Sequence, residues 1–208
     1  AYIRQMLKAC LEIPSPCGDT EEISQFLKKE LESMEIETRV TNKGAIIGIL
    51  PGEKEGFSRM VSAHVDTLGA MVRSVTSEGK LKLISVGGFT MESIEGMYCK
   101  VHTRTGKTYT GTILTKSPSV HVQDDARTLE RKEKNMEVRL DEVVHNAEDV
   151  AKLEIGTGDF ISFDPMFVYT ESGFIKSRHL DDKASVAVLM GVLKDMAEQK
   201  FVPEMTVK

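Results

Sequence analysis

The sequence predicts a mixed α/β fold, a sheet layered with helices, with a β-rich insert in the middle of the chain. Three observations support this prediction. Amphipathic helical periods occur near both ends, apolar runs of strand length follow the first helices, and short alternating strands separated by Gly, Ser and Thr fill the middle. We therefore expect an α/β domain formed by residues 1–68 and 165–208, interrupted by a β-rich domain at residues 69–164.

Helices are predicted at both ends of the chain. Residues 2–13 place apolar side chains at helical spacing, and the turn at 13–19, with two prolines and a glycine, ends that helix. A second helix is expected to begin near Thr20, because Glu21 favours the positive end of a helix dipole. A third helix is expected at about 182–198, where apolar residues line one side.

Strands are predicted between these helices. Two of them are nearly all apolar, which is typical of strands buried on both faces. A charged stretch of the insert is interpreted as an exposed loop. The expected strands are 36–41, the two apolar strands 44–50 and 59–66, and, in the insert, 80–87, 97–104 and 108–114; the expected loop is 128–135.

Composition excludes several classes of protein. The 208 residues include 27 basic and 32 acidic side chains, a net charge of -5 that is spread along the chain, so no basic face for nucleic acid is expected. The apolar runs are shorter than the roughly 20 residues that span a bilayer, so no membrane partner is expected. Cys10, Cys17 and Cys99 lack CxxC spacing, and no secretory signal begins the sequence, which predicts reduced thiols and a cytoplasmic protein.

The stretch SAHVDTLGAMV at residues 62–72 carries a histidine and an aspartate two positions apart. Alternate residues of a strand face the same side, so we expect His64 and Asp66 to be neighbours at the carboxyl end of a strand, where open α/β sheets place ligand sites. Imidazole binds zinc, cobalt or manganese, and a nearby carboxylate can orient it. A second interpretation stays open here, in which both side chains only satisfy backbone groups of a turn.

The stretch RHLDDKASVAVL at residues 178–189 places two adjacent aspartates before an apolar helix. Aspartate is a favoured N-cap, worth about 1 kcal/mol over alanine, but two aspartates exceed what one cap requires. One of Asp181 and Asp182 can cap the helix while the other faces a metal, and a carboxylate can bridge two cations. His179 lacks matching spacing and is interpreted as structural.

Five stretches, in this order, resemble the M42 family of metallo-aminopeptidases, which includes glutamyl aminopeptidases and tetrahedral aminopeptidases. The resemblance runs through essentially the whole chain. The five stretches are IPSPCGDTEEI, SAHVDTLGAMV, GTILTKSPSVHV, IGTGDFISFDP and IKSRHLDDKASVAVL.

This resemblance implies a zinc-peptidase-like catalytic domain that removes N-terminal residues from short peptides with two divalent metal ions, zinc or cobalt first and manganese as a third option. It assigns His64 as a metal ligand, Asp66 as a catalytic residue that supports the site, and Asp181 as the ligand that bridges the two ions. A general-base glutamate and the remaining ligands are expected after Lys208. The catalytic domain is thus expected to be incomplete and this fragment inactive alone.

The resemblance also implies self-association. Residues 69–164 match the family's dimerisation domain, which pairs subunits and helps to build a shell of up to twelve subunits. His121 matches a histidine of that domain rather than a metal ligand. SPSVHV at residues 117–122 replaces the more usual proline-proline-histidine pattern of the family, so the resemblance carries the metal assignment but not the shape of this loop.

Two groups of alternatives remain open on the sequence. The first keeps a two-metal fold with another substrate, as in an M20-like peptidase or deacylase, or in the relatives labelled endoglucanases. The second is a non-catalytic assembly or binding protein that retains the fold with a degenerate site. An adjacent glutamate pair after Lys208 would favour the enzyme.

Overall fold

A computed structural model describes residues 1–54 and 56–208, which form two compact units. Unit 1 consists of residues 1–67 and 165–208, and unit 2 of residues 68–164. All described buried apolar side chains except Ala126 fall into two clusters, one within each unit. Each unit therefore has a hydrophobic core of its own.

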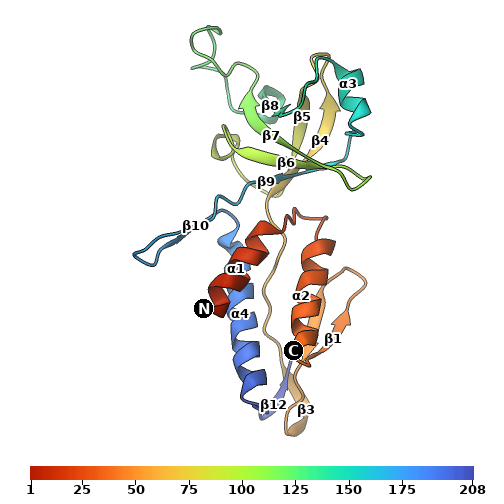
Figure 1. Cartoon of the computed structure of the whole chain (residues 1–208), viewed down its shortest axis with the longest axis vertical. Coiled ribbons are helices and arrows are strands. Elements are labelled where there is room, and N and C mark those ends of the chain that lie inside the picture. The colour runs from red at the N-terminus through yellow and green to blue at the C-terminus, as the bar shows by residue number, and fades with distance from the viewer. The chain divides into compact units, whose positions relative to one another are not determined.

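Unit 1 is built around three helices, and α1 lies alongside α4 (Figure 1). The apolar sides of all three helices contribute to one buried core, which includes Leu7 of α1, Ile23 of α2 and Met190 of α4. No helix in the described part of the chain is long and apolar enough to cross a membrane. The helices are α1 (Tyr2–Glu12), α2 (Glu21–Ser33) and α4 (Leu180–Glu198).

The strands of unit 1 form three separate two-stranded sheets. Two are antiparallel, β1–β2 and β10–β11, while β12 pairs with β3 in parallel. The described residues of unit 1 thus combine helices with parallel and antiparallel strand pairs, but they do not form one continuous mixed sheet. The strands are β1 (Glu37–Val40), β2 (Ile46–Ile49), β3 (Lys54–Arg59), β10 (Val168–Tyr169), β11 (Ile175–Lys176) and β12 (Met205–Val207).

The strand predicted at residues 59–66 is largely wrong. The observed strand β3 ends at Arg59, and residues 60–66 belong to no strand. The last ladder contact joins the Val61 N–H to the Lys208 carbonyl at 2.9 Å, and the described residues pair no strand with residues 62–66. Burial on both faces is also wrong here, since Met60 is 77% exposed, and β2 is only half-buried.

Unit 2 is a closed six-stranded barrel with the strand order β4-β5-β8-β7-β6-β9. All neighbouring strands are antiparallel, and the pairing of β4 with β9 closes the barrel. Helix α3 and two short 3-10 turns lie in the connections. The elements are β4 (Gly69–Val75), β5 (Leu81–Val86), η1 (Met91–Ser93), β6 (Tyr98–His102), β7 (Thr108–Thr115), η2 (Glu133–Asn135), β8 (Met136–Leu140), α3 (Ala147–Lys152) and β9 (Phe160–Phe163).

Alternating side chains fill the interior of this barrel. Val72, Leu83, Val101, Ile113 and Ile161 are almost completely buried and come from five different strands. Strands β7 and β8 approach closely at Gly111, where a Cβ atom would lie 2.7 Å from the Arg139 carbonyl oxygen. Any side chain at this position would push the two strands apart, so the glycine is required there.

Candidate metal-binding site

The structure brings together the histidine and one aspartate of the two sequence stretches. His64 Nε2 lies 3.1 Å from Asp181 Oδ1, although the two residues are 117 positions apart in the chain. On the other side of the ring, His64 Nδ1 lies 3.2 Å from Asp66 Oδ1. Both aspartates thus flank one imidazole, and all three side chains belong to unit 1.

The second aspartate of the pair also reaches the histidine segment. The His64 backbone N–H donates to Asp182 Oδ2 at 3.4 Å. The backbone angles of Asp181 (φ -85°, ψ 107°) and Asp182 (φ -120°, ψ 23°) are not helical, so the regular turns of α4 begin at Lys183. Both carboxylates consequently leave the helix axis and can approach His64.

The two other histidines that the sequence singled out occupy different places. His179 stands at the N-cap position of α4 with a left-handed backbone, φ 64°. His121 lies in unit 2, in the segment between β7 and β8. The pairing of His64 with Asp66 and Asp181 involves neither of these two residues.

The site is open to solvent and acidic. The side chain of His64 is 52% exposed, and that of Asp181 is 95% exposed. Partial burial lowers the pKa of His64, but the charge of Asp66 and the hydrogen bond to Asp181 together outweigh it, so the pKa is raised above its ordinary value. A cation at Nε2 must therefore displace a proton that two carboxylates stabilise.

The donor atoms fit part of a metal site. Zinc bonds of about 2.1 Å to nitrogen and oxygen at a tetrahedral angle put the two donors about 3.4 Å apart, close to the observed 3.1 Å between His64 Nε2 and Asp181 Oδ1. Asp66 on the other ring nitrogen is the partner that fixes the tautomer of a metal-bound histidine. However, the described residues contain no group of three or more His, Cys, Asp or Glu side chains that could hold a metal ion. They fit two ligands, and catalytic zinc sites use three.

Two buried polar residues beside the site were not predicted from the sequence. Ser15 Oγ donates to the Val65 carbonyl at 2.7 Å, and Lys183 Nζ donates to the Ile13 carbonyl at 2.8 Å. Burial lowers the pKa of Lys183 to about 8. A signal for Lys183 exists in the sequence, because it lies three and seven positions before Val186 and Met190, on the apolar stripe of α4.

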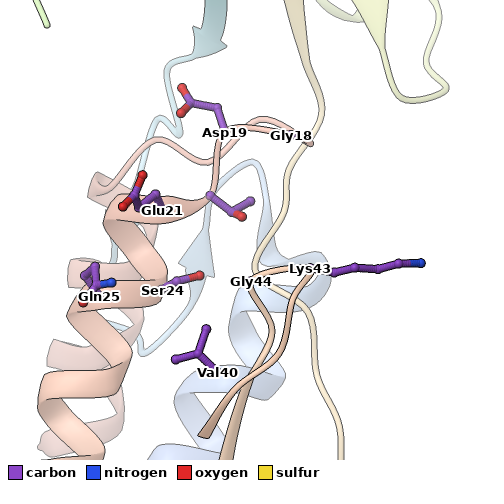
Figure 2. A pocket seen from close by; sticks show the side chains of 9 residues that line it. Gly18, Asp19, Glu21, Ser24, Gln25, Val40, Lys43 and Gly44 are labelled. Carbon is purple, nitrogen blue, oxygen red and sulfur yellow. The ribbon is translucent and has the colours of Figure 1, made fainter.

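A separate surface hollow of about 350 Å³ lies between the start of α2 and the β1–β2 hairpin (Figure 2). None of the predicted site residues lines it. Figure 2 shows Lys43 pointing away from α2, while Asp19 and Glu21 lie at the helix start. This acidic start of the helix offers no concentration of positive charge for an anion, so the candidate site remains at His64. The lining residues are Gly18, Asp19, Thr20, Glu21, Ser24, Gln25, Val40, Lys43 and Gly44.

Comparison with known proteins identifies relatives of the chain. The model of the family described as M42 glutamyl aminopeptidase matches residues 44–207. The protein YhfE of Bacillus subtilis (strain 168) is 50% identical over 192 residues, which cover 92% of this chain and 56% of YhfE. A TET aminopeptidase from a marine sediment archaeon of the Thaumarchaeota has a TM-score of 0.87 at 22% identity, over 99% of this chain and 56% of that one. The TET1 peptidase of Pyrococcus horikoshii has a TM-score of 0.81 at 24% identity, and the match covers 99% of this chain and 59% of that one.

The solved structures bear on the fold, and the family model bears on the family. The two solved structures support a mixed α/β fold similar to that of TET aminopeptidases. The chain spans about half the length of the relatives it matches. The family model covers most of the chain, from residue 44 to residue 207, and the chain therefore belongs to the M42 glutamyl aminopeptidase family.

Proposed function

We propose that the protein to which this chain belongs is a metal-dependent aminopeptidase that removes N-terminal residues from short peptides at a binuclear centre. The proposal rests on family membership and on one observation. His64 Nε2 and Asp181 Oδ1 face each other at 3.1 Å from segments 117 residues apart. That contact unites an imidazole and a carboxylate, which are ligands that zinc and cobalt accept and manganese tolerates.

Each residue has a specific role in this proposal. His64 and Asp181 would hold metal, Asp181 as the bridging carboxylate. Asp66 would keep the Nδ1 side of His64 occupied, so that Nε2 presents its lone pair to the cation. Divalent ions, when bound, would lower the pKa of a water molecule and polarise the scissile carbonyl. The catalytic domain is the zinc-peptidase-like one, formed by residues 1–68 and 165–208 together with the rest of the relatives' length.

The test is peptidase activity and metal content of the full-length protein. We expect metal-loaded protein to release p-nitroaniline from aminoacyl-p-nitroanilides in the presence of cobalt, zinc or manganese. His64→Ala and Asp181→Ala should each lower metal content and reduce activity at least about 100-fold, since loss of either ligand disrupts the centre. His121→Ala, in unit 2, is the matched histidine control and should retain both. Unchanged metal content in the first two variants would overturn the site.

A non-catalytic assembly or binding protein is the second candidate function. In that case the fold would be retained around a degenerate site. The same assay separates the two candidates, because an assembly protein would bind neither cobalt nor zinc and release no p-nitroaniline. Release of reducing sugar from cellulose would instead support the endoglucanase alternative, which requires a pair of positioned carboxyl groups. Hydrolysis of an N-acylated amino acid would likewise support the M20-like deacylase alternative over the aminopeptidase.

Self-association through unit 2 is part of the proposal, as is a cytoplasmic location. The TET1 peptidase of Pyrococcus horikoshii can assemble into a tetrahedron or a large octahedral shell. Unit 2 of this chain exposes Tyr98, Val122 and Val143, which are 69%, 78% and 87% exposed. Sedimentation velocity of the full-length protein should show an oligomer, up to a dodecamer, that Val122→Glu dissociates.

The proposed cytoplasmic location rests on the three free cysteines, which suit a reducing compartment.

A further inference from the structure

A turn at residues 13–17, here called the connecting turn, is buried at Ser15 and Pro16 and contacts both segments of the candidate site. The turn follows α1 and reads IPSPC. On one side it is hydrogen-bonded to the segment that carries His64 and Asp66, and on the other to the residue that follows Asp181 and Asp182. The two halves of the site are thus joined through a third stretch of chain.

Ser15 makes the first connection. Its hydroxyl donates to the Val65 carbonyl at 2.7 Å, and its own carbonyl accepts from the Thr67 N–H at 2.8 Å. Cys17 N–H then donates to the Thr67 carbonyl at 3.1 Å. The side chain of Ser15 is buried, with 1% of the residue exposed. Because Val65 lies between His64 and Asp66, this contact fixes the backbone that aims both side chains.

Lys183 makes the second connection. Its Nζ donates to the Cys10 carbonyl at 2.7 Å and to the Ile13 carbonyl at 2.8 Å, and the residue is 1% exposed. These carbonyls lie at the C-terminal end of α1, where a cation is favoured. Lys183 also begins the regular turns of α4. Anchoring it to α1 therefore fixes the point from which Asp181 leaves the helix.

The site segments need such support because neither is held by regular secondary structure. Residues 60–66 belong to no strand, and Asp181 and Asp182 have non-helical angles. Binding sites require side chains to be held within roughly 0.5 Å of the productive geometry. Buried hydrogen bonds to a shared turn can supply that constraint, since a buried polar group costs free energy when its partner is lost.

We propose that Ser15 and Lys183 are positioning residues, which hold His64 and Asp181 at ligand distance through the connecting turn. The functional part of this inference rests on the proposed metal-dependent peptidase. Its structural part concerns only how the two side chains are placed. The two parts are tested separately.

The structural part is tested by metal-free crystal structures of the full-length protein. In Ser15→Ala and Lys183→Met we expect the distance between His64 Nε2 and Asp181 Oδ1 to grow from 3.1 Å to beyond hydrogen-bonding range. Ser33→Ala is the matched control, because the Ser33 hydroxyl also donates to a carbonyl, that of Glu30, at 2.7 Å. An unchanged His64–Asp181 distance in both test variants would overturn the inference, whether or not the protein binds metal.

The functional part is tested with Co²⁺ alone, followed by its visible absorption spectrum during titration. We expect Ser15→Ala and Lys183→Met to bind Co²⁺ at least about ten-fold more weakly, with an altered absorption band. Ser15→Thr retains the hydroxyl and should restore both. Ile23→Val, which loosens the core of unit 1 without removing a hydrogen bond, controls for lost stability and should bind Co²⁺ as the unmodified protein does.

The possible results separate the two proposals. Ile23→Val and Ser15→Ala are compared at an equal loss of melting temperature. If both variants then bind Co²⁺ equally weakly, Ser15 acts only through stability, and the positioning role is overturned. Failure of the unmodified protein to bind Co²⁺ would overturn the proposed function, and the crystal structures would then decide the placement of His64 and Asp181 by themselves.

Discussion

The two units differ in how their strands are partnered. In unit 2 every strand has two neighbours, so the closed barrel has no free edge. Unit 1 has three two-stranded sheets, and two-stranded sheets are marginal by themselves. Phe57, Met60 and Phe201 are more than half exposed there. The difference teaches that the candidate site lies in the less regular unit, where side-chain hydrogen bonds and one isolated β-bridge, rather than a ladder, hold the segments that carry it.

The largest expected effect compares the interiors of the two units. Ile161→Ala removes a completely buried side chain from β9 and should lower the free energy of unfolding by about 2–5 kcal/mol. Ile46→Ala in the half-buried strand β2 should cost less, because fewer atoms lose contact. Urea unfolding followed by circular dichroism measures both. An equal loss in the two variants would remove the contrast between a closed and an open unit.

The next effect is a pH dependence of the barrel. Burial, and then the charge of Asp141, raise the pKa of Cys99 to about 12 from its ordinary value near 9. The unfolded chain therefore loses this proton first as the pH rises, and stability falls between pH 9 and pH 12, by at most about 1.4 kcal/mol per pH unit. The contribution is complete below pH 9.

Cys99→Ala isolates this effect from other groups that titrate at high pH. The loss of stability between about pH 9.5 and about pH 10.5, measured by urea unfolding, should be smaller in the variant than in the unmodified protein. Cys10 provides the comparison in unit 1, where burial, partly opposed by Lys183, raises the pKa to about 11. Equal slopes for Cys99→Ala and the unmodified protein would show that the thiol does not contribute.

The sequence predicted the helices well because their period and their ends are local signals. The expected helices at 2–13 and 182–198 correspond to α1 and α4 within about two residues. The insert strands at 80–87 and 108–114 correspond to β5 and β7. For strand 59–66 the apolar composition could not reveal that the described residues supply a neighbour only as far as Val61.

Polar residues were the harder part of the prediction. His64 and Asp181 were recognised as candidates, and their contact at 3.1 Å is a long-range fact that a resemblance, not periodicity, led us to expect. Ser15 and Lys183 were missed because their partners are backbone carbonyls, which any residue supplies. The charged stretch 128–135 is exposed or half-buried except at Asn135, which is buried and whose side chain donates to the Glu130 carbonyl.

A smaller effect tests how tightly the barrel is packed. Thr115 Oγ1 is buried and has no hydrogen-bond partner among the described residues. Thr115→Val replaces the hydroxyl by a methyl group of similar size and removes this desolvation cost, so we expect a gain of about 1 kcal/mol in the free energy of unfolding. Thermal unfolding measures the gain, and Thr110→Val at an exposed position of β7 is the matched control. A loss of stability in Thr115→Val would indicate that the hydroxyl is bonded in solution.

The smallest expected effect concerns a surface ion pair in unit 1. Arg39 on β1 lies 3.0 Å from Glu37, with the two side chains 70% and 57% exposed. Water screens such a pair, and holding two long side chains in one geometry costs entropy, so Arg39→Ala should change the free energy of unfolding by less than about 0.5 kcal/mol. Urea unfolding at low and at high salt measures this. A larger, salt-sensitive loss would mean that the open hairpin β1–β2 depends on surface charge, and the proposed contrast between the two units would then lie in their electrostatics as well as in their strand pairing.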